Sequence, residues 1–176
     1  MSASDIISNT PGATLTDYTS TGLIIADLHG TDTAAVIQEL SVALGREGRI
    51  ADWPAFSQAA LDREHLCGTV TEPDWALPHV RVKGIDNPCF ALGRAHTPIA
   101  WVGHQPLRVR WIFLLAAPET EAQSYLTLLA ALARLSADTP LLDRLLKASH
   151  SLEILELLRR VNMSAGSSSG NPSKPD

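Results

Sequence analysis

Apolar residues recur at a helical spacing in the first half of the chain, and this pattern predicts two amphipathic helices. Thr31 or Asp32 caps the first helix, and Gly45 ends it. The second helix begins at Asp52 and has Pro54 in its first turn, where the missing N–H costs nothing. The residues predicted to face the core are Val36, Ile37, Leu40, Ala43 and Leu44 in the first helix, and Phe56, Ala60 and Leu61 in the second.

The C-terminal part of the chain shows the same spacing and predicts three more helices. The first follows a capping box, Thr120-Glu121-Ala122-Gln123, the second starts at Thr139-Pro140, and the third contains Ile154 and Leu158. By contrast, the charged end of the second helix, Asp62 to Leu66, is expected to lie in solvent. The residues of the three C-terminal helices predicted to face the core are Tyr125, Leu128, Leu129, Leu132, Leu135, Leu141, Leu142, Leu145, Leu146, Ile154, Leu155 and Leu158.

Four runs between or before the helices have the composition of strands: Gly22 to Ala26, Cys89 to Arg94, Ile99 to Trp101, and Leu107 to Ala116. The last run alternates at first and is then continuously apolar. This change indicates a strand that is half exposed at its start and buried on both faces around Phe113. Short strands interleaved with helices predict an α/β fold, with a mixed β-sheet flanked by helices on both faces.

The length of 176 residues suits one domain with a sizeable core. Residues 1–14 are polar and contain a Pro-Gly pair, so they are expected to form a flexible lead. Residues 15–162 form the predicted domain. Residues 163–176 are rich in Ser, Gly and Pro with little to bury, which predicts a disordered tail.

Composition narrows the choice of partners and of compartment. The net charge is −5 and no basic residues cluster, so nucleic acid is not an expected partner. No secretory signal is visible at the N-terminus, and no apolar run approaches the ~20 residues that span a bilayer, so no membrane insertion and a cytoplasmic location are expected. The two cysteines and the histidines share no ligand spacing, so neither a metal site nor a cofactor is expected.

One histidine stands where chemistry can take place, in the run from Glu72 to Arg81. Pro78 fixes its own φ and pushes Leu77 into extended geometry, so a short strand is predicted to end there and to present His79 at its exit. Arg81 follows two residues later and shares a face with His79 in an extended chain. Because arginine pairs with phosphate or carboxylate, this pair suits a neutral imidazole that accepts an anionic group.

The run Ala76-Leu77-Pro78-His79-Val80-Arg81, together with the stretch from Pro106 to Pro118, resembles the type-2 A component (EIIA) of the bacterial sugar phosphotransferase system. This is the fructose, mannitol and nitrogen-regulatory branch. The similarity extends roughly from Leu15 to Arg160 and implies the same α/β fold. It also implies that the histidine of the Pro-His pair is phosphorylated by a small histidine phosphocarrier protein and passes the group on, usually to a cysteine of an EIIB component.

On this resemblance His79 is the phosphorylated residue, and it attacks the incoming phosphohistidine as a neutral imidazole. Arg81 would counter the charge of the phosphoryl group, roughly minus two. Thr69, with backbone N–H groups of the loop before His79, would donate hydrogen bonds to the phosphoryl oxygens. The chain would then be a phosphotransferase component with a phosphohistidine intermediate, which serves sugar transport or regulation.

Two features depart from the family's pattern. The family usually has a glycine-rich run before the histidine, whereas here Pro73 removes a backbone donor, and Glu72 and Asp74 add negative charge. The family also has a second histidine at the start of the next helix, and Tyr125 stands at the matching position. A tyrosine hydroxyl donates a hydrogen bond, but it stays neutral near pH 7 and cannot shuttle a proton there.

The alternatives to a carrier therefore remain open. One is a phosphorylation-impaired EIIA-like module that binds and regulates a transporter or an enzyme, with the altered loop and Tyr125 as its signs. Another is a small-ligand site in a cleft at His79, supported only by Trp75 and Arg81. From the residues alone, without the resemblance, a strand-end histidine bonded to a backbone carbonyl is the simpler interpretation of His79.

Overall fold

The computed structural model describes residues 12–71, 74–102, 107–120 and 123–163 of the chain. Within these residues, six strands form one mixed sheet in the order β1-β5-β6-β3-β2, and β4 also pairs with β6. The strands are β1 (Ile24–Ile25), β2 (Val70–Thr71), β3 (Trp75–Ala76), β4 (His79–Val82), β5 (Cys89–Trp101) and β6 (Leu107–Pro118).

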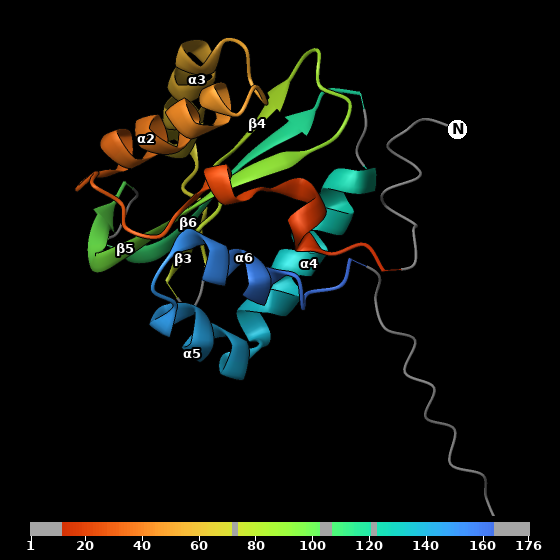
Figure 1. The fold of residues 1–176 in the computed structure, drawn as a ribbon. Helices are drawn as coiled ribbons and strands as arrows, with labels where there is room; N and C mark the ends of the chain where they lie inside the picture. The colour runs from red at the N-terminus through yellow and green to blue at the C-terminus, as the bar shows by residue number, and fades with distance from the viewer. Residues whose placement is uncertain (1–11, 72–73, 103–106, 121–122, 164–176) are drawn as a thin grey trace, which may run out of the picture.

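The two long strands β5 and β6 pair antiparallel in the middle of the sheet (Figure 1). β1 runs parallel to β5, and β3 and β4 run parallel to β6 one after the other. The short strand β2 pairs antiparallel with β3 at the outer edge. The confirmed fold class is therefore α/β with a mixed sheet.

Two strand predictions need correction. The runs expected to be separate strands at 89–94 and 99–101 form one strand, β5, whose register shifts between Arg94 and Ile99. Side chains of β6 stabilise this irregularity, because Arg110 Nη1 donates to the His96 carbonyl at 2.7 Å and Arg108 Nη1 to the Pro98 carbonyl at 3.0 Å. The first strand is also shorter than predicted, since a 3₁₀ turn, η2 (Thr21–Leu23), occupies its beginning.

Five α-helices and a second 3₁₀ turn complete the described part of the chain. Asp32 caps the first helix by accepting from the Ala35 N–H at 2.9 Å, and Asp52 caps the second by accepting from the Ala55 N–H at 3.1 Å. Gly45 does not end the first helix as predicted. Two residues of the predicted capping box, 121–122, lie outside the described residues. The helices are α2 (Thr33–Arg46), α3 (Trp53–Leu66), α4 (Gln123–Ala137), α5 (Thr139–Lys147) and α6 (Ser151–Leu158), and the 3₁₀ turn is η1 (Leu15–Tyr18).

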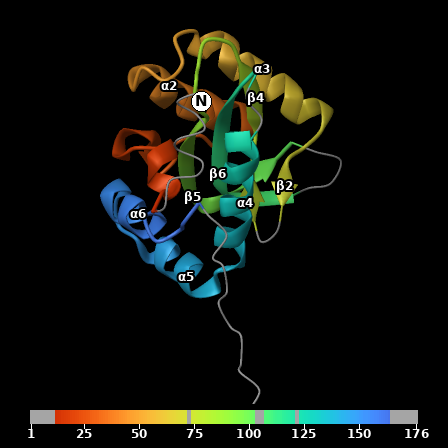
Figure 2. The same cartoon turned by 90° about the vertical axis from the view of Figure 1, so that its right-hand side faces the viewer.

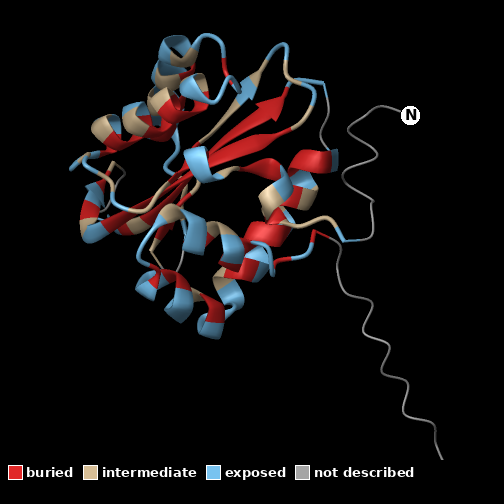
Figure 3. Ribbon diagram, viewed as in Figure 1, coloured by how far each residue is buried: buried red, intermediate tan, exposed pale blue. Residues whose placement is uncertain are grey.

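The helices cover both faces of the sheet, as predicted. In Figure 1, α2 and α3 lie above the sheet and α4, α5 and α6 below it. The apolar end of β6 serves both layers, since Phe113 and Leu115 pack with α4–α6 while Ile112 and Leu114 pack with α2 and α3. Figure 3 shows the resulting buried sheet between helices whose outer faces are exposed. A continuously apolar strand thus resolves into two core faces by the two-residue alternation of extended chain.

A buried cation joins the sheet to the lower helical layer. Arg94 of β5 is 5% exposed, and its Nε donates to the Ala26 carbonyl at 2.9 Å. Its Nη1 donates to the carbonyls of Leu145 at 3.0 Å and of Ala148 at 2.6 Å, at the C-terminal end of α5. These carbonyls carry the negative end of the helix dipole, so the guanidinium is compensated without a carboxylate partner.

The two ends of the described chain lie side by side. Thr14 and Asn162 form an antiparallel bridge, and the Met163 N–H donates to the Ala13 carbonyl at 2.8 Å. Residues 1–11 and 164–176, which hold most of the predicted flexible lead and disordered tail, lie outside the described residues.

The central position of Phe113 generates a stability prediction. Its side chain is 1% exposed and stacks on Trp75, with ring centroids 4.6 Å apart. Phe113→Ala should therefore lower the free energy of unfolding by about 3–5 kcal/mol in chemical denaturation, because it leaves a cavity between the sheet and α4. Leu152→Ala is a matched control, since Leu152 is 52% exposed on α6 and should change stability by less than about 0.5 kcal/mol. A loss below about 1 kcal/mol for Phe113→Ala would contradict its place in the core.

Candidate functional site

The site is built on an interruption of the sheet between β3 and β4. Ala76 stands opposite Ile112 and His79 opposite Leu115, so the register with β6 is the same before and after the break. Pro78 has no N–H to donate, although its carbonyl accepts from the Leu115 N–H at 2.9 Å. His79 is consequently the first residue of β4, whereas the sequence predicted it at the exit of a strand.

Hydrogen bonds to both ring nitrogens of His79 determine its tautomer. Nδ1 lies 3.0 Å from the carbonyl oxygen of Leu77, and Nε2 lies 3.3 Å from Nη2 of Arg63. A carbonyl oxygen can only accept and a guanidinium can only donate. Nδ1 therefore carries the hydrogen, and Nε2 keeps a lone pair that faces Arg63.

Arg63 is a site residue that the sequence reasoning missed. It lies in the last turn of α3, in the stretch expected to be solvated, and its side chain reaches His79 from there. Figure 2 shows α3 running toward the edge of the sheet near β2, with α4 in front of β6. Sixteen positions separate Arg63 from His79 in the sequence, so only the packing of α3 beside β4 brings them together.

The prediction that the end of α3 lies in solvent is wrong for Glu64, which is 1% exposed. Its carboxyl accepts from the Thr69 N–H at 2.8 Å, from the Thr69 hydroxyl at 2.9 Å and from the Trp101 indole N–H at 2.8 Å. These donors satisfy a group whose burial would otherwise be costly. A signal was present in the sequence, because Phe56, Ala60 and Glu64 follow each other at a spacing of four on the buried face of α3.

Tyr125, in the first turn of α4, lies beside His79 and Arg81. Its ring centroid is 6.1 Å from that of His79, and the guanidinium carbon of Arg81 lies 5.3 Å from the Tyr125 ring centroid. Nη1 of Arg81 also donates to the Pro118 carbonyl at 3.0 Å. Burial raises the pKa of Tyr125 above its usual value, and the nearby charges of Arg81 and Arg63 offset part of that rise. The phenol is therefore neutral at physiological pH.

The structure thus brings three of the predicted site residues together around one ring: His79, Arg81 and Tyr125. Thr69 has a different environment, because its hydroxyl donates to Glu64 and accepts from the Leu77 N–H at 3.1 Å. The hydroxyl hydrogen is therefore already used inside the protein.

Two residues of the segment before His79, Asp74 and Trp75, use their side chains for contacts within the protein. Trp75 is 1% exposed and stacks on Phe113, so it packs in the core and does not line a cleft. Asp74 forms an ion pair with Arg110, with 3.5 Å between its carboxylate and Nε, which compensates the negative charge that the sequence placed near His79. Glu72 and Pro73 lie outside the described residues.

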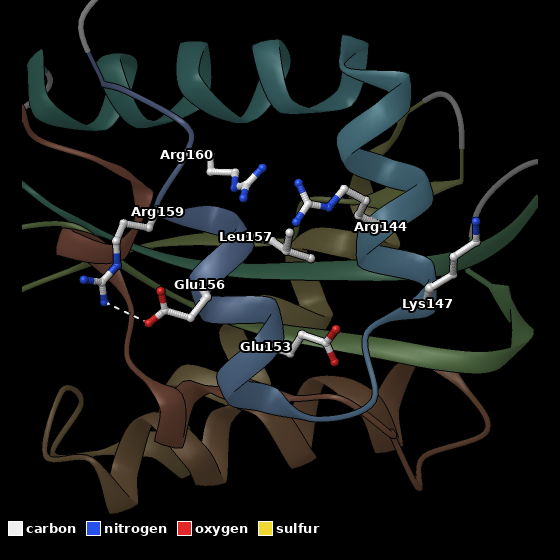
Figure 4. Close-up of a pocket in the computed structure, with 7 residues that line it drawn as sticks. All are labelled: Arg144, Lys147, Glu153, Glu156, Leu157, Arg159 and Arg160. Atoms are coloured by element: carbon white, nitrogen blue, oxygen red, sulfur yellow. Dashed lines mark hydrogen bonds and ion pairs between the residues drawn. The ribbon is translucent and has the colours of Figure 1, made fainter.

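One hollow of the surface borders the site at Arg81, and another lies between two helices away from it. One of about 530 Å³ lies beside Arg81, between the start of α3 and the turn after β4. Another of about 560 Å³ lies between α5 and α6 and is lined by charged side chains, among them the paired Glu156 and Arg159 (Figure 4). The second contains none of the predicted site residues.

Large apolar side chains are exposed around His79. Leu66, one turn after Arg63 on α3, is 82% exposed, and Leu126, next to Tyr125 on α4, is 55% exposed. An exposed leucine alone needs no explanation, but two in the helical turns that carry Arg63 and Tyr125 suit a protein partner.

Two negative findings concern the described residues only. They contain no group of three His, Cys, Asp or Glu side chains that could hold a metal ion. None of their helices is both long and apolar enough to cross a membrane.

Known proteins are similar to this chain in sequence and in fold. The chain is 23% identical over 146 residues to the PTS system fructose-specific EIIABC component of Bacillus subtilis (strain 168), which covers 83% of this chain but 23% of that relative. The chain thus spans less than a quarter of the length of that curated relative.

Solved structures share the fold. The nitrogen regulatory protein IIA-Ntr from Neisseria meningitidis superposes with a TM-score of 0.67 and 23% identity, over 82% of this chain and 98% of that one. Enzyme IIAMTL of Escherichia coli, in its complex with phosphorylated enzyme IIBMTL, superposes with a TM-score of 0.63 and 19% identity, over 79% of this chain and 95% of that one.

The family model described as "Phosphoenolpyruvate-dependent sugar phosphotransferase system, EIIA 2" matches residues 17–161. This stretch includes the interrupted strand, both arginines and Tyr125. The chain therefore belongs to the type-2 EIIA family of the phosphoenolpyruvate-dependent sugar phosphotransferase system.

Proposed function

We propose that this chain is a phosphohistidine carrier, which accepts a phosphoryl group on Nε2 of His79 from a histidine phosphocarrier protein and passes it to an EIIB component or uses it in regulation. The observation that carries the proposal is the pair of hydrogen bonds on His79. They leave the lone pair on Nε2 and place a guanidinium beside it. Family membership supports the same role.

The proposed transfer needs no group beyond the two imidazoles and the charges around them. The lone pair of His79 Nε2 attacks the phosphorus of the donor's phosphohistidine, the donor's P–N bond breaks, and its electron pair returns to the donor ring. The His79 Nδ1–H stays bonded to the Leu77 carbonyl, which stabilises the positive charge that develops on the ring. Catalysis of this kind rests on positioning and charge rather than on acid–base chemistry.

Two guanidinium groups supply the charge that the phosphoryl group needs. Arg63 contacts Nε2 directly, and Arg81 lies over the Tyr125 ring that neighbours His79. The phosphoryl group brings a charge of roughly minus two, so two cations around it compensate it fully. This pairing supports the carrier function although Tyr125 stands where the family's pattern has a second histidine.

A second candidate function is a phosphorylation-impaired EIIA-like module that binds and regulates a transporter or an enzyme. The position of Tyr125 beside His79 favours it, because a phenol is neutral near pH 7 and cannot supply the positive charge that a second histidine could. The two functions differ in whether His79 takes up a phosphoryl group, and one measurement separates them.

The proposed phosphoryl donor and the EIIB acceptor bind the surface that includes the exposed Leu66 and Leu126. In the complex of enzyme IIAMTL with phosphorylated enzyme IIBMTL from Escherichia coli, the A component is similar in fold to this chain. We therefore assign the surface around His79, with Leu66 and Leu126, to both the donor and the EIIB acceptor. The group must pass between the same reactive nitrogen and each partner, so the two partners bind this surface in turn.

The carrier function predicts an acid-labile mass increase of one phosphoryl group on His79. Purified protein is incubated with phosphoenolpyruvate, the first enzyme of the system and its histidine phosphocarrier, and its intact mass is then measured. His79→Ala should abolish the increase. His65→Ala is the matched control and should keep it, because His65 is exposed on α3 and its ring bonds to the Leu61 carbonyl of its own helix. No increase in the wild-type protein, with the donor phosphorylated, would refute the carrier function and favour the regulatory module.

Arg63 is predicted to act on the rate of transfer rather than on stability. Arg63→Gln should lower the rate constant for phosphorylation of His79 on the order of a hundredfold, because it removes a charge preorganised beside the developing phosphoryl charge. The side chain is exposed, so the unfolding midpoint should hardly change. Arg46→Gln, at the exposed end of α2, is the matched control. Equal rates in rapid-quench experiments for Arg63→Gln and the control would exclude this role.

Leu66 is predicted to bind the phosphocarrier protein. Leu66→Ser should raise the KM for the phosphorylated donor roughly tenfold, since a leucine buried at an interface contributes on the order of 1.5 kcal/mol. Leu152→Ser, a similarly exposed leucine on α6, should leave KM unchanged. An unchanged KM for Leu66→Ser would move the docking surface away from the end of α3.

A further inference from the structure

We propose that Glu64 is a positioning residue for phosphoryl transfer, because it holds in place both hydrogen-bond partners of His79. The proposal rests on the function proposed for His79. Glu64 touches neither the reacting nitrogen nor the phosphoryl group. Its carboxyl is buried and connects the end of α3, the loop after it and strand β5.

The first connection runs through α3 to Nε2 of His79. Trp101 of β5 donates its indole N–H to Glu64 at 2.8 Å and so ties the last turn of α3 to the sheet. Arg63 directly precedes Glu64 in that turn, and its Nη2 lies 3.3 Å from Nε2 of His79. Because neighbouring residues of a helix point to different sides, one anchors the turn in the core while the other reaches the site.

The second connection runs through the loop to Nδ1 of His79. Thr69 donates its hydroxyl hydrogen to Glu64, and the same hydroxyl oxygen accepts the Leu77 N–H at 3.1 Å. The Thr69 carbonyl is a second, longer acceptor for Leu77 at 3.3 Å. The Leu77 carbonyl in turn accepts the Nδ1–H of His79 at 3.0 Å. The Glu64 carboxyl therefore orients the Thr69 hydroxyl, which holds the Leu77 backbone in the position where its carbonyl accepts the Nδ1–H of His79.

The acceptor-only character of the carboxyl gives this hydrogen-bond chain its direction. Since both oxygens of Glu64 accept, the Thr69 hydroxyl must donate to them and is left with lone pairs for the Leu77 N–H. An amide at this position would replace the Oε2 acceptor by an N–H group, so the Thr69 oxygen would accept from two donors and its hydrogen bond to the Leu77 N–H would weaken. Leu77, and with it the carbonyl that holds Nδ1–H, would lose its fixed position.

Two variants break the chain at different points. Glu64→Gln keeps the shape of the side chain but replaces one acceptor by a donor. Thr69→Val keeps the shape of Thr69 and removes the hydroxyl that accepts the Leu77 N–H, which leaves Leu77 only its longer hydrogen bond to the Thr69 carbonyl. The Trp101–Glu64 hydrogen bond stays. Ser41→Ala is the matched control, because the Ser41 hydroxyl is also buried but donates to the Ile37 carbonyl within α2 at 2.7 Å.

The first readout is the tautomer of His79, measured by nitrogen–proton correlation spectra of the imidazole ring at alkaline pH, where the ring is neutral. A purely structural role of Glu64 would not move it. The wild-type protein and Ser41→Ala should show Nδ1–H with a bare Nε2. Glu64→Gln and Thr69→Val should show a substantial population with the hydrogen on Nε2, and their phosphorylation rate constants should fall roughly ten- to a hundredfold.

Folded variants of Glu64 and Thr69 with the wild-type tautomer would overturn the proposal, and so would a wild-type rate constant. If Glu64→Gln fails to fold, Thr69→Val decides the question alone. If the wild-type protein takes up no phosphoryl group, the proposed function fails, while the tautomer comparison still tests whether Glu64 positions His79. The two failures are therefore distinguishable.

Discussion

The antiparallel pairing of β5 with β6 is the interaction on which the rest of the structure depends. β1 adds to β5, and both β3 and β4 add to β6, so three further strands find their place through this pair. Both helical layers pack on it, because the apolar end of β6 is buried on its two faces. An unpaired backbone group in such a buried strand costs free energy. The strands beside β5 and β6 must therefore pair with them in register.

The candidate site lies where the parallel pairing with β6 is interrupted between β3 and β4. Pro78 lacks an N–H, and Leu77 directs its N–H to Thr69 instead of to β6. The Leu77 carbonyl is then free to accept from His79, which starts the next strand two residues later. A break of this kind leaves the register intact, so the imidazole is placed as accurately as any side chain of the sheet. Rigid elements of this kind suit a site that works by position and charge.

Two buried ionisable side chains, Arg94 and Glu64, anchor the helical layers to the sheet, and among the described residues neither forms an ion pair. Arg94 donates to backbone carbonyls that include the end of α5, and Glu64 accepts from N–H and O–H groups at the end of α3. Each charge is compensated by dipoles, which avoids the demand for a second buried ion. Of these two side chains, only Glu64 is adjacent in sequence to a residue that contacts His79, namely Arg63. Glu64 can therefore influence the candidate site, whereas Arg94 serves the packing of α5.

The sequence by itself determined the fold class and the helix positions, and it identified His79 as the candidate site histidine. Periodicity of the apolar residues was sufficient for the helices, and the Pro-His-x-Arg pattern singled out His79 and Arg81 because proline and arginine impose their geometry locally. Only the tertiary structure decided that β5 is continuous, that Trp101 is a partner of Glu64 and that Arg63 is the residue on Nε2 of His79. These features depend on the packing of α3 beside the sheet. Contacts between residues far apart in the sequence leave no local pattern from which they can be predicted.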